Sequence, residues 1–323
     1  MRTMRLLRLL AVLSAPALLL TFPVACDEGE TTAPEEETPV LASDWVGQAN
    51  WDAAEVVTVT MVEESPSSYV FQPNQLTFEA GKPYIVRLVS PGSNQAKHYF
   101  ATEGGTDLYK AVATRKIQTS EAEYKAPHFE AVEMKTGGTA LEWYFVAVLP
   151  GTYEIVCTIP GHRELGMTAT ATITGGEGYE LDLEIASDFN MALANDARKS
   201  GSHDVWNSRL DALVTMSETP YGFVPTDLDL TQDVAYMITI DNPDGHESKH
   251  YFTAAELYKT FVTRKAEDSQ AEIKPLYFNA VELLIGGTTE LFVVPTSTGT
   301  FESICTIEGH AAAGMKGTVV VAQ

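Results

Sequence analysis

Basic residues are scarce in this chain of 323 residues, which has 21 Lys and Arg against 44 Asp and Glu. Three of the arginines lie among the first ten residues, so the rest of the chain has 18 basic residues and is more acidic still. This balance excludes nucleic acid as a partner. The same charge also favours solubility, so it does not identify a partner by itself.

An apolar run long enough to cross a membrane is also missing. The run that follows Arg2, Arg5 and Arg8 falls short of the ~20 residues that a spanning helix needs. A basic start and a short apolar run are typical of a secretory signal, which we assign to residues 1–25. Cys26 follows a small residue, as the lipid-carrying cysteine does in bacterial lipoproteins, although Pro23 replaces the usual Leu. We expect lipid attachment at Cys26; plain signal cleavage and an uncleaved anchor are the alternatives.

Residues 26–44 lack aromatic and basic side chains and are rich in acidic residues, Pro and Thr. Such a segment cannot bury enough apolar surface to order itself. We predict a flexible acidic tether that holds the folded part away from a membrane.

Cysteine is rarer than any of these, since the chain has only Cys26, Cys157 and Cys305. The last two occupy matching positions in two similar parts of the chain, which argues against a disulfide between them. An exported protein that keeps two unpaired thiols must protect them from oxidation. Binding of a metal ion would protect both.

Two copies of one motif surround these thiols. Residues 157–169 read CTIPGHRELGMTA and residues 305–317 read CTIEGHAAAGMKG, so each copy has Cys, His and Met at the same spacing. Each copy is preceded, far upstream, by Lys-His-Tyr-Phe at residues 97–100 and 249–252. A single motif of this kind could arise by chance, and a single His or Met usually packs in a core. Two complete copies in the same order argue against both readings.

One thiolate, two imidazoles and one thioether are the ligands of a mononuclear copper site for electron transfer. Thiolate stabilises Cu(I), imidazole suits both oxidation states, and a weak axial thioether raises the potential. The spacing predicts that Cys157 ends a strand, that His162 turns back from a loop, and that Met167 opens the next strand. Pro160 and Gly161 suit the turn between them.

These residues resemble those of the cupredoxin, or blue copper, family, and in particular of azurin, plastocyanin and auracyanin-like proteins. The resemblance covers nearly the whole chain after the leader. It implies two type 1 copper centres that cycle between Cu(I) and Cu(II), and it gives these ligands by position: His98, Cys157, His162 and Met167, then His250, Cys305, His310 and Met315. Many cupredoxins have Asn after the first ligand His, whereas this chain has Tyr99 and Tyr251.

The repeat extends over whole domains. Trp51 matches Trp206, and Phe129-Glu-Ala-Val-Glu matches Phe278-Asn-Ala-Val-Glu, at offsets near those of the motifs. Short alternating strands with Gly and Pro between them predict an all-β fold of two tandem Greek-key sandwiches. We place the first domain at residues 45–175, a short linker at 176–185 and the second domain at 186–323, and the short linker predicts that the domains pack closely. Residues 106–119 and 255–268 are predicted as a short helical insertion in each domain, because apolar residues recur there at helical spacing.

The histidine count bears on catalysis. Multicopper oxidases and two-domain nitrite reductases share the tandem layout but add a catalytic copper, with a His directly before the Cys. Here Val156 and Ile304 stand before the cysteines, and the sequence has no His-x-His pair. The remaining histidines, His128, His203 and His246, are expected on the surface. No nucleophile triad, phosphate-binding loop or zinc motif stands out either, so the sequence predicts a protein that is not an enzyme.

The prediction from the sequence is thus a membrane-anchored bacterial protein, facing the periplasm or the cell exterior, that exchanges single electrons. Basic redox proteins such as c-type cytochromes are the expected partners, and the resemblance implies that electrons leave through His162 and His310. A copper-homeostasis protein, either buffer or donor, is the alternative; a structural adhesion role with one vestigial site is a third.

Overall fold

Alternating residues bury one face of most strands. The computed structural model describes residues 40–102, 107–191 and 206–323. In β4 (Pro83–Ser90), Tyr84, Val86 and Leu88 are buried while the residues between them are more exposed. Successive side chains of a strand point to opposite faces, so this pattern places one face of the sheet on a core.

The first half of the folded chain follows the predicted all-β pattern. Glu55–Thr174 is called the first half from here on. Its strands are β1 (Glu55–Ser65), β2 (Ser68–Gln72), β3 (Gln75–Glu79), β4, β5 (His98–Thr102), β6 (Val112–Gln118), β7 (Ala122–Lys125), β8 (Phe129–Met134), β9 (Thr139–Ala147), β10 (Gly151–Val156) and β11 (Thr168–Thr174). A short helix, α1 (Ala42–Gln48), and a 3-10 turn, η1 (Trp51–Ala53), precede it. One layer has the strand order β2-β1-β4-β9-β6-β7, and the other has the order β3-β11-β10-β5-β8.

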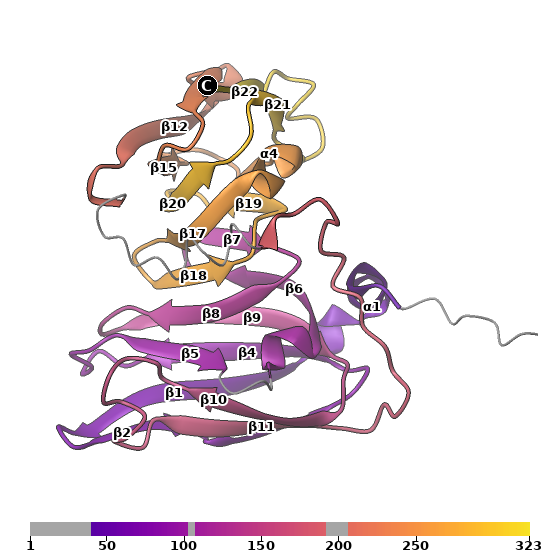
Figure 1. Ribbon diagram of the computed structural model, residues 1–323, viewed down its shortest axis with the longest axis vertical. Coiled ribbons are helices and arrows are strands. Elements are labelled where there is room, and N and C mark those ends of the chain that lie inside the picture. Colours follow the sequence, from indigo (N-terminus) through magenta and orange to yellow (C-terminus); the bar gives the residue numbers. More distant parts are fainter. Residues whose placement is uncertain (1–39, 103–106, 192–205) are drawn as a thin grey trace, which may run out of the picture. The chain divides into compact units, whose positions relative to one another are not determined.

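The second half repeats this arrangement strand for strand. It covers Leu210–Ala322 and contains β12 (Leu210–Glu218), β13 (Tyr221–Val224), β14 (Asp227–Thr231), β15 (Tyr236–Asp241), β16 (His250–Phe252), β17 (Phe261–Glu267), β18 (Ala271–Pro275), β19 (Ala280–Leu283), β20 (Thr288–Pro295), β21 (Gly299–Ile304) and β22 (Lys316–Ala322). One layer runs β13-β12-β15-β20-β17-β18, and the other is formed by β16-β19 and β14-β22-β21. The predicted fold class, two tandem sandwiches, is confirmed (Figure 1).

The pairing is antiparallel except where β1 lies beside β4 and β3 beside β11, and the second half repeats both exceptions. The aromatic residues Phe78, Tyr84 and Phe145 pack edge to face or tilted between the two layers of the first half. Such pairs add to the free energy gained from burial of the rings. Among the described residues, no helix has the length and apolarity needed to cross a bilayer.

The predicted helical insertions are mostly wrong. Only Leu108–Lys110 forms a 3-10 turn, η2, and only Ala255–Lys259 forms an α-helix, α4. Most of the remainder that the structure describes is strand β6 or β17, and each of these pairs along its length with β9 or β20. The helical spacing came from Leu108 and Val112, and from Leu257 and Phe261, where one turn of helix runs directly into a strand. Pairing within the sheet overrode the local pattern.

Strands of one half pair with strands of the other at the boundary between them. β8 of the first half pairs antiparallel with β18 of the second, and β7 pairs antiparallel with β19. The repeat makes β7 the counterpart of β18, and β8 the counterpart of β19. The contact is therefore reciprocal: each half supplies the same two strands, as in a symmetric dimer. The halves pack as the short linker predicted.

Candidate metal centres

The first candidate centre lies where a strand meets a loop. β10 ends at Val156, so Cys157 follows directly, and β5, which begins with His98, pairs with β10. This pairing brings the upstream His beside a loop that is almost sixty residues away in the sequence. His98 Nδ1 lies 3.2 Å from His162 Nδ1, and Cys157 Sγ lies 3.4 Å from the same nitrogen.

The second centre has the same geometry. His250 Nδ1 lies 3.1 Å from His310 Nδ1, and Cys305 Sγ lies 3.5 Å from it. A bridge between Thr253 and Ile304 joins the strand of the upstream His to the strand of the cysteine. In both centres the two imidazole nitrogens and the sulfur lie within 4.8 Å of one another. The structure thus brings together the six Cys and His residues that the sequence predicted.

The two methionines are held by the same loops. Cys157 donates its backbone N–H to the carbonyl of Met167 at 3.1 Å, and Met167 donates to the carbonyl of His162 at 3.0 Å. The second loop repeats these bonds at 3.0 and 2.9 Å. Met167 and Met315 are both fully buried. Each methionine therefore lies at the base of its loop, with its backbone bonded to that of the cysteine.

Glycine is required in this loop. Gly161 has φ of +88° and its counterpart Gly309 has φ of +84°, a region that L side chains rarely adopt. The residues that precede these glycines, Pro160 and Glu308, do not have positive φ. This explains why the repeat keeps the glycine and allows the residue before it to change.

A carboxylate holds the outer nitrogen of each upstream His, and the sequence reading missed it. Glu63 Oε1 lies 3.2 Å from His98 Nε2, and Glu218 Oε1 lies 3.1 Å from His250 Nε2. A carboxylate on one ring nitrogen fixes the orientation of the ring and leaves the other nitrogen free for a metal. The signal was present, because Thr-Met-x-Glu occurs at residues 60–63 and again at residues 215–218.

The pKa shifts fit this role. Burial opposes ionisation of Glu218, but hydrogen bonds from Ser248 and Glu247 outweigh it and lower the pKa of this carboxyl to about 2. Glu63 behaves in the same way: burial opposes ionisation, and the backbone N–H groups of Ala96 and Gln95 prevail, so its pKa is lowered. Both carboxylates are therefore ionised at neutral pH.

The imidazoles and thiols are prepared for a metal. Burial, with the second imidazole as a further cause, lowers the pKa of His98, and burial also lowers the pKa of His162 and His250. These rings are neutral at pH 7 and carry a free lone pair. Burial raises the pKa of the Cys157 and Cys305 thiols. Without a cation the thiol keeps its proton, so a metal ion would have to displace it.

The donors fit copper. Thiolate and thioether are soft ligands, imidazole suits copper in both oxidation states, and the sites lie in a dry interior. The tie made by Asn in many cupredoxins is replaced by a backbone bond: Tyr99 N–H donates to Cys157 Sγ at 3.3 Å, and Tyr251 N–H donates to Cys305 Sγ at 3.4 Å. A second backbone N–H, of Ile159 in the first centre and of Ile307 in the second, also bonds to the sulfur.

A third group of Glu218, His246 and His250 could hold a cation by geometry alone. Its carboxylate is already occupied, since it accepts from the backbone of Glu247 and Ser248 and from the Ser248 hydroxyl. His246 Nδ1 lies 2.6 Å from Asn242 Oδ1. We therefore interpret this group as the support of His250.

The other histidines depart in part from expectation. His128 is only 2% exposed and lies 3.8 Å from Asp107, so its predicted place on the surface is wrong. His246 is partly buried. His203, Cys26 and the predicted tether up to residue 39 lie outside the described residues.

Comparisons with known proteins agree with the family resemblance. No protein-family model matches the chain. Auracyanin-B of Chloroflexus aurantiacus is 27% identical over 119 residues, which is 35% of this chain and 51% of that protein. The chain thus spans about half the length of this relative.

Two solved structures match a larger share of this chain than auracyanin-B does, at a lower sequence identity. A copper-containing nitrite reductase (NirK) from Thermus scotoductus SA-01 is 12% identical, with 83% of this chain and 62% of that chain covered and a TM-score of 0.29. A multicopper oxidase is 12% identical, with 85% and 92% covered and a TM-score of 0.27.

The sandwich topology and the paired Cys–His groups are similar to those of cupredoxin-like proteins, as the sequence predicted. Its sequence resembles that of auracyanin-B in particular.

The prediction that this chain is not an enzyme is contradicted, because a copper nitrite reductase and a multicopper oxidase are among the similar structures. That prediction depended on the absence of a His beside each cysteine. Such a test covers the second copper sites of those enzymes and not every reaction that a copper centre supports. Enzymatic activity is therefore no longer excluded.

Proposed function

We propose that the chain is an exported electron-transfer protein that holds two type 1 copper centres, one in each half. The ligands would be His98, Cys157, His162 and Met167 in the first centre and His250, Cys305, His310 and Met315 in the second. The observation that carries the proposal is the convergence, twice, of two imidazole nitrogens and one thiol within 4.8 Å.

The protein's own residues would limit the rearrangement that accompanies a change of oxidation state. Glu63 and Glu218 fix one imidazole of each centre, and the backbone bonds between Cys and Met fix the loop. His98, Cys157 and Met167 are at most 1% exposed, so water has little access. A site that is rigid and shielded from water has a small reorganisation energy when it gains or loses one electron.

Transfer to a partner would use the second imidazole of each centre. His162 is 7% exposed, in contrast to the fully buried His98, and His310 is partly buried. These rings form the side of each centre nearest to solvent. Their position supports His162 and His310 as the exits for electrons.

The proposed location and partners come from the sequence. Residues 1–25 would be removed as a signal peptide, Cys26 would carry lipid, and residues 26–44 would link the lipid to the folded part. This places the protein on a membrane, facing the periplasm or the cell exterior. The excess of acidic residues would attract basic redox proteins, such as c-type cytochromes, and repel nucleic acid.

Copper content and optical spectra test the proposal. The copper-loaded protein should hold two copper ions per chain and show the intense visible band of a Cu(II)–thiolate bond. Cys157→Ala and Cys305→Ala should each remove one copper and part of the band, and the double variant should remove both. A colourless, fully loaded protein would contradict the proposal, as would a preference for zinc.

Reversible potentials separate an electron carrier from a copper buffer or donor. An electron carrier should be oxidised and reduced without loss of metal and should exchange electrons with a basic cytochrome. Transfer of copper to a chelating partner, with no electron exchange, would support the role in copper homeostasis instead.

A further inference from the structure

Two polar clusters lie across the strand pairs that join the halves. The Tyr99 cluster consists of Lys97, Tyr99 and Glu133 from the first half and Lys265, Glu272 and Lys274 from the second. The Tyr251 cluster consists of the counterparts of these six: Lys249, Tyr251 and Glu282 from the second half and Lys116, Glu123 and Lys125 from the first. Each cluster thus contains residues of both halves in mirrored roles.

The strand register aligns the central residues of each cluster. Tyr99 of β5 is opposite Glu133 of β8, which is opposite Glu272 of β18. In the second half, Tyr251 is opposite Glu282, which is opposite Glu123 of β7. Residues directly opposite each other share one face of a sheet, so each tyrosine and its two carboxylates lie in one row.

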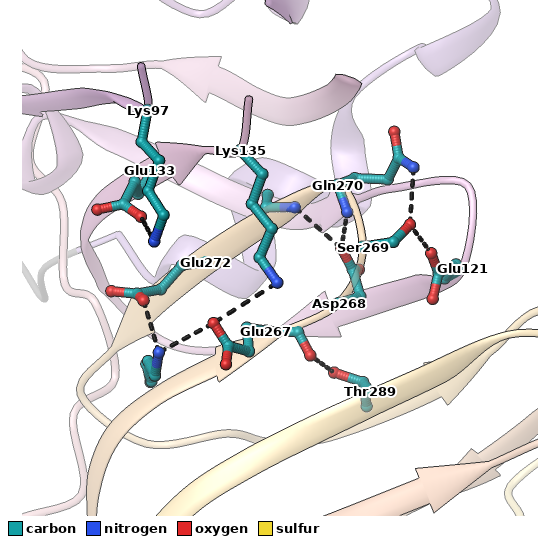
Figure 2. Close-up of polar contacts among 12 residues, drawn as sticks. Lys97, Glu121, Glu133, Lys135, Glu267, Asp268, Ser269, Gln270, Glu272 and Thr289 are labelled. Carbon is teal, nitrogen blue, oxygen red and sulfur yellow. Dashed lines mark hydrogen bonds and ion pairs between the residues drawn. The ribbon is translucent and has the colours of Figure 1, made fainter. Parts of the chain in front are cut away.

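In the Tyr99 cluster, the phenol is held by the other half. Tyr99 donates to Glu272 Oε1 at 3.2 Å and accepts from Lys274 Nζ at 2.6 Å. The same ammonium lies 4.4 Å above the centre of the Tyr99 ring. Lys265 pairs with the other oxygen of Glu272 at 2.7 Å. Figure 2 shows Glu272 near the ion pair of Lys97 and Glu133.

The Tyr251 cluster has the same contacts with the halves exchanged. Tyr251 donates to Glu123 Oε1 at 3.3 Å and accepts from Lys125 Nζ at 2.5 Å. The ammonium of Lys125 lies 4.6 Å from the ring centre. Lys116 pairs with Glu123 Oε2 at 2.6 Å. The same six residues and their contacts therefore recur in two places that share no atom.

The carboxylates that hold the tyrosines are buried, so these contacts restrict the positions of the tyrosine side chains. Glu272 is 6% exposed and Glu123 is 5% exposed. Burial opposes their ionisation, but the flanking lysines prevail and lower the pKa of both carboxyls. A buried carboxylate that loses one of its partners is costly, so the tyrosine has few alternative positions.

Both tyrosines also reach the metal centres of their own halves. Tyr99 follows His98, and its backbone N–H donates to Cys157 Sγ at 3.3 Å. Tyr251 has the same relation to Cys305 at 3.4 Å. One residue thus bonds to the thiol through its backbone and to the opposite half through its phenol.

We propose that Glu272 and Lys274 of the second half are positioning residues for the first metal centre, and that Glu123 and Lys125 of the first half are positioning residues for the second. This inference rests on the two metal centres of the proposed function. By holding the tyrosine, the opposite half fixes one of the two backbone N–H donors of the thiolate. A hydrogen bond to that sulfur tunes the potential of a copper–thiolate centre.

The direction of the effect follows from charge. An N–H donor stabilises electron density on sulfur and therefore favours Cu(I) over Cu(II). When the tyrosine is released, this bond lengthens and the potential falls. Glu272→Gln should lower the potential of the first centre and leave the second centre unchanged, although residue 272 belongs to the second half.

The main experiment uses the full-length, copper-loaded protein with one centre removed. In the Cys305→Ser background only the first centre is titrated. Glu272→Gln should lower its reduction potential by at least ~28 mV, which is a threefold change in the equilibrium constant for one-electron reduction. The matched control is Glu267→Gln, because Glu267 also pairs with Lys265 and, across the halves, with Lys135 (Figure 2), while the bonds of the Tyr99 phenol go to Glu272 and Lys274. The control should shift the potential by less than a third as much.

The reciprocal arm uses the Cys157→Ser background, where Glu123→Gln should lower the potential of the second centre. Tyr99→Phe keeps the backbone donor and the ring and removes only the phenol bond, so it should act like Glu272→Gln in the first arm. Combining Tyr99→Phe with Glu272→Gln should give little more than either change alone, because both break the same link. Equal shifts from Glu267→Gln and Glu272→Gln would overturn the proposal, as would no shift from Glu272→Gln.

A second readout needs no metal. In the metal-free protein, alkylation of Cys157 and Cys305 by iodoacetamide can be followed in the same molecule by mass spectrometry. Glu272→Gln should raise the rate at Cys157 at least threefold relative to Cys305, and Glu123→Gln should do the reverse. Failure of wild-type protein to bind copper would refute the proposed function alone. An unchanged ratio of alkylation rates would refute the cross-positioning alone.

Discussion

Asp268 should contribute strongly to stability, because one carboxylate serves both halves. It lies just after β17 and is 5% exposed. Its Oδ2 accepts from the hydroxyls of Thr119 at 2.6 Å and Tyr124 at 2.9 Å, which belong to the first half. Its Oδ1 accepts from the backbone N–H groups of Gln270 at 2.8 Å and Ala271 at 3.0 Å.

The cost of Asp268→Ala can be worked out from these four donors. Tyr124 retains a contact with Thr289 at 2.8 Å, and Thr119 retains one with the carbonyl of Ala122 at 3.3 Å, so the hydroxyls keep other partners. The two backbone donors lose their carboxylate acceptor. An unsatisfied buried donor costs about 1–3 kcal/mol, so the two donors together predict a loss of about 2–6 kcal/mol in the free energy of unfolding. Asp268→Asn keeps a carbonyl oxygen for the backbone and should lose about 1 kcal/mol.

Urea unfolding of the metal-free protein, followed by circular dichroism, measures this loss. Asp241→Ala is the matched control, because Asp241 is only partly buried and accepts from the single hydroxyl of Thr288 at 2.7 Å. It should lose no more than about 1 kcal/mol. If Asp268→Ala lost as little as Asp241→Ala, the reasoning from shared buried donors would be wrong.

Two further predictions concern the surroundings of the second centre. Because the pKa of Glu218 is lowered to about 2 from an ordinary 4.5, its contribution to stability is present above pH 4.5 and is lost as the pH falls toward 2. Urea unfolding of the metal-free protein from pH 7 to pH 2 should therefore show a smaller acid-induced loss for Glu218→Gln than for wild type, and the exposed Glu302→Gln should follow wild type. Gly314→Ala should cost about 1–3 kcal/mol in thermal unfolding, since residue 314 has φ of +119° and an added Cβ would lie 2.8 Å from the carbonyl oxygen of Tyr221. Gly47→Ala, with nothing within 4 Å of the added atom, should be neutral or stabilising, and an equal loss at both positions would contradict this explanation.

The sequence was sufficient for the parts of the fold that repeat and for the residues that gather at each centre. Alternation predicted the strands because one face of each sheet lies on a core, as the alternating burial along β4 illustrates. The Cys–His–Met loop was predictable because its spacing is set by one turn between two strands. His98 and His250 were found only because the repeat singled them out.

Features that depend on contacts between distant segments escaped the sequence reading. Residues 112–118 became strand because β9 pairs with them, and no local signal records that pairing. Glu63 was passed over because a Glu at the end of a strand is usually a solvated residue. His128 is buried because the fold places it near Asp107. The Tyr99 and Tyr251 clusters depend on contacts between the two halves, which a pattern within one half does not reveal.

The reciprocal pairing of β7 with β19 and β8 with β18 has a consequence for the chain as a whole. In an isolated half, both of these strands would lie at the open margin of a sheet, with rows of unpaired N–H and C=O groups. Such margins recruit strands from other molecules and promote aggregation. Because the two copies are covalently linked, the edge strands of one half always have those of the other half to pair with. Each half therefore protects the sheet edges of the other from other molecules.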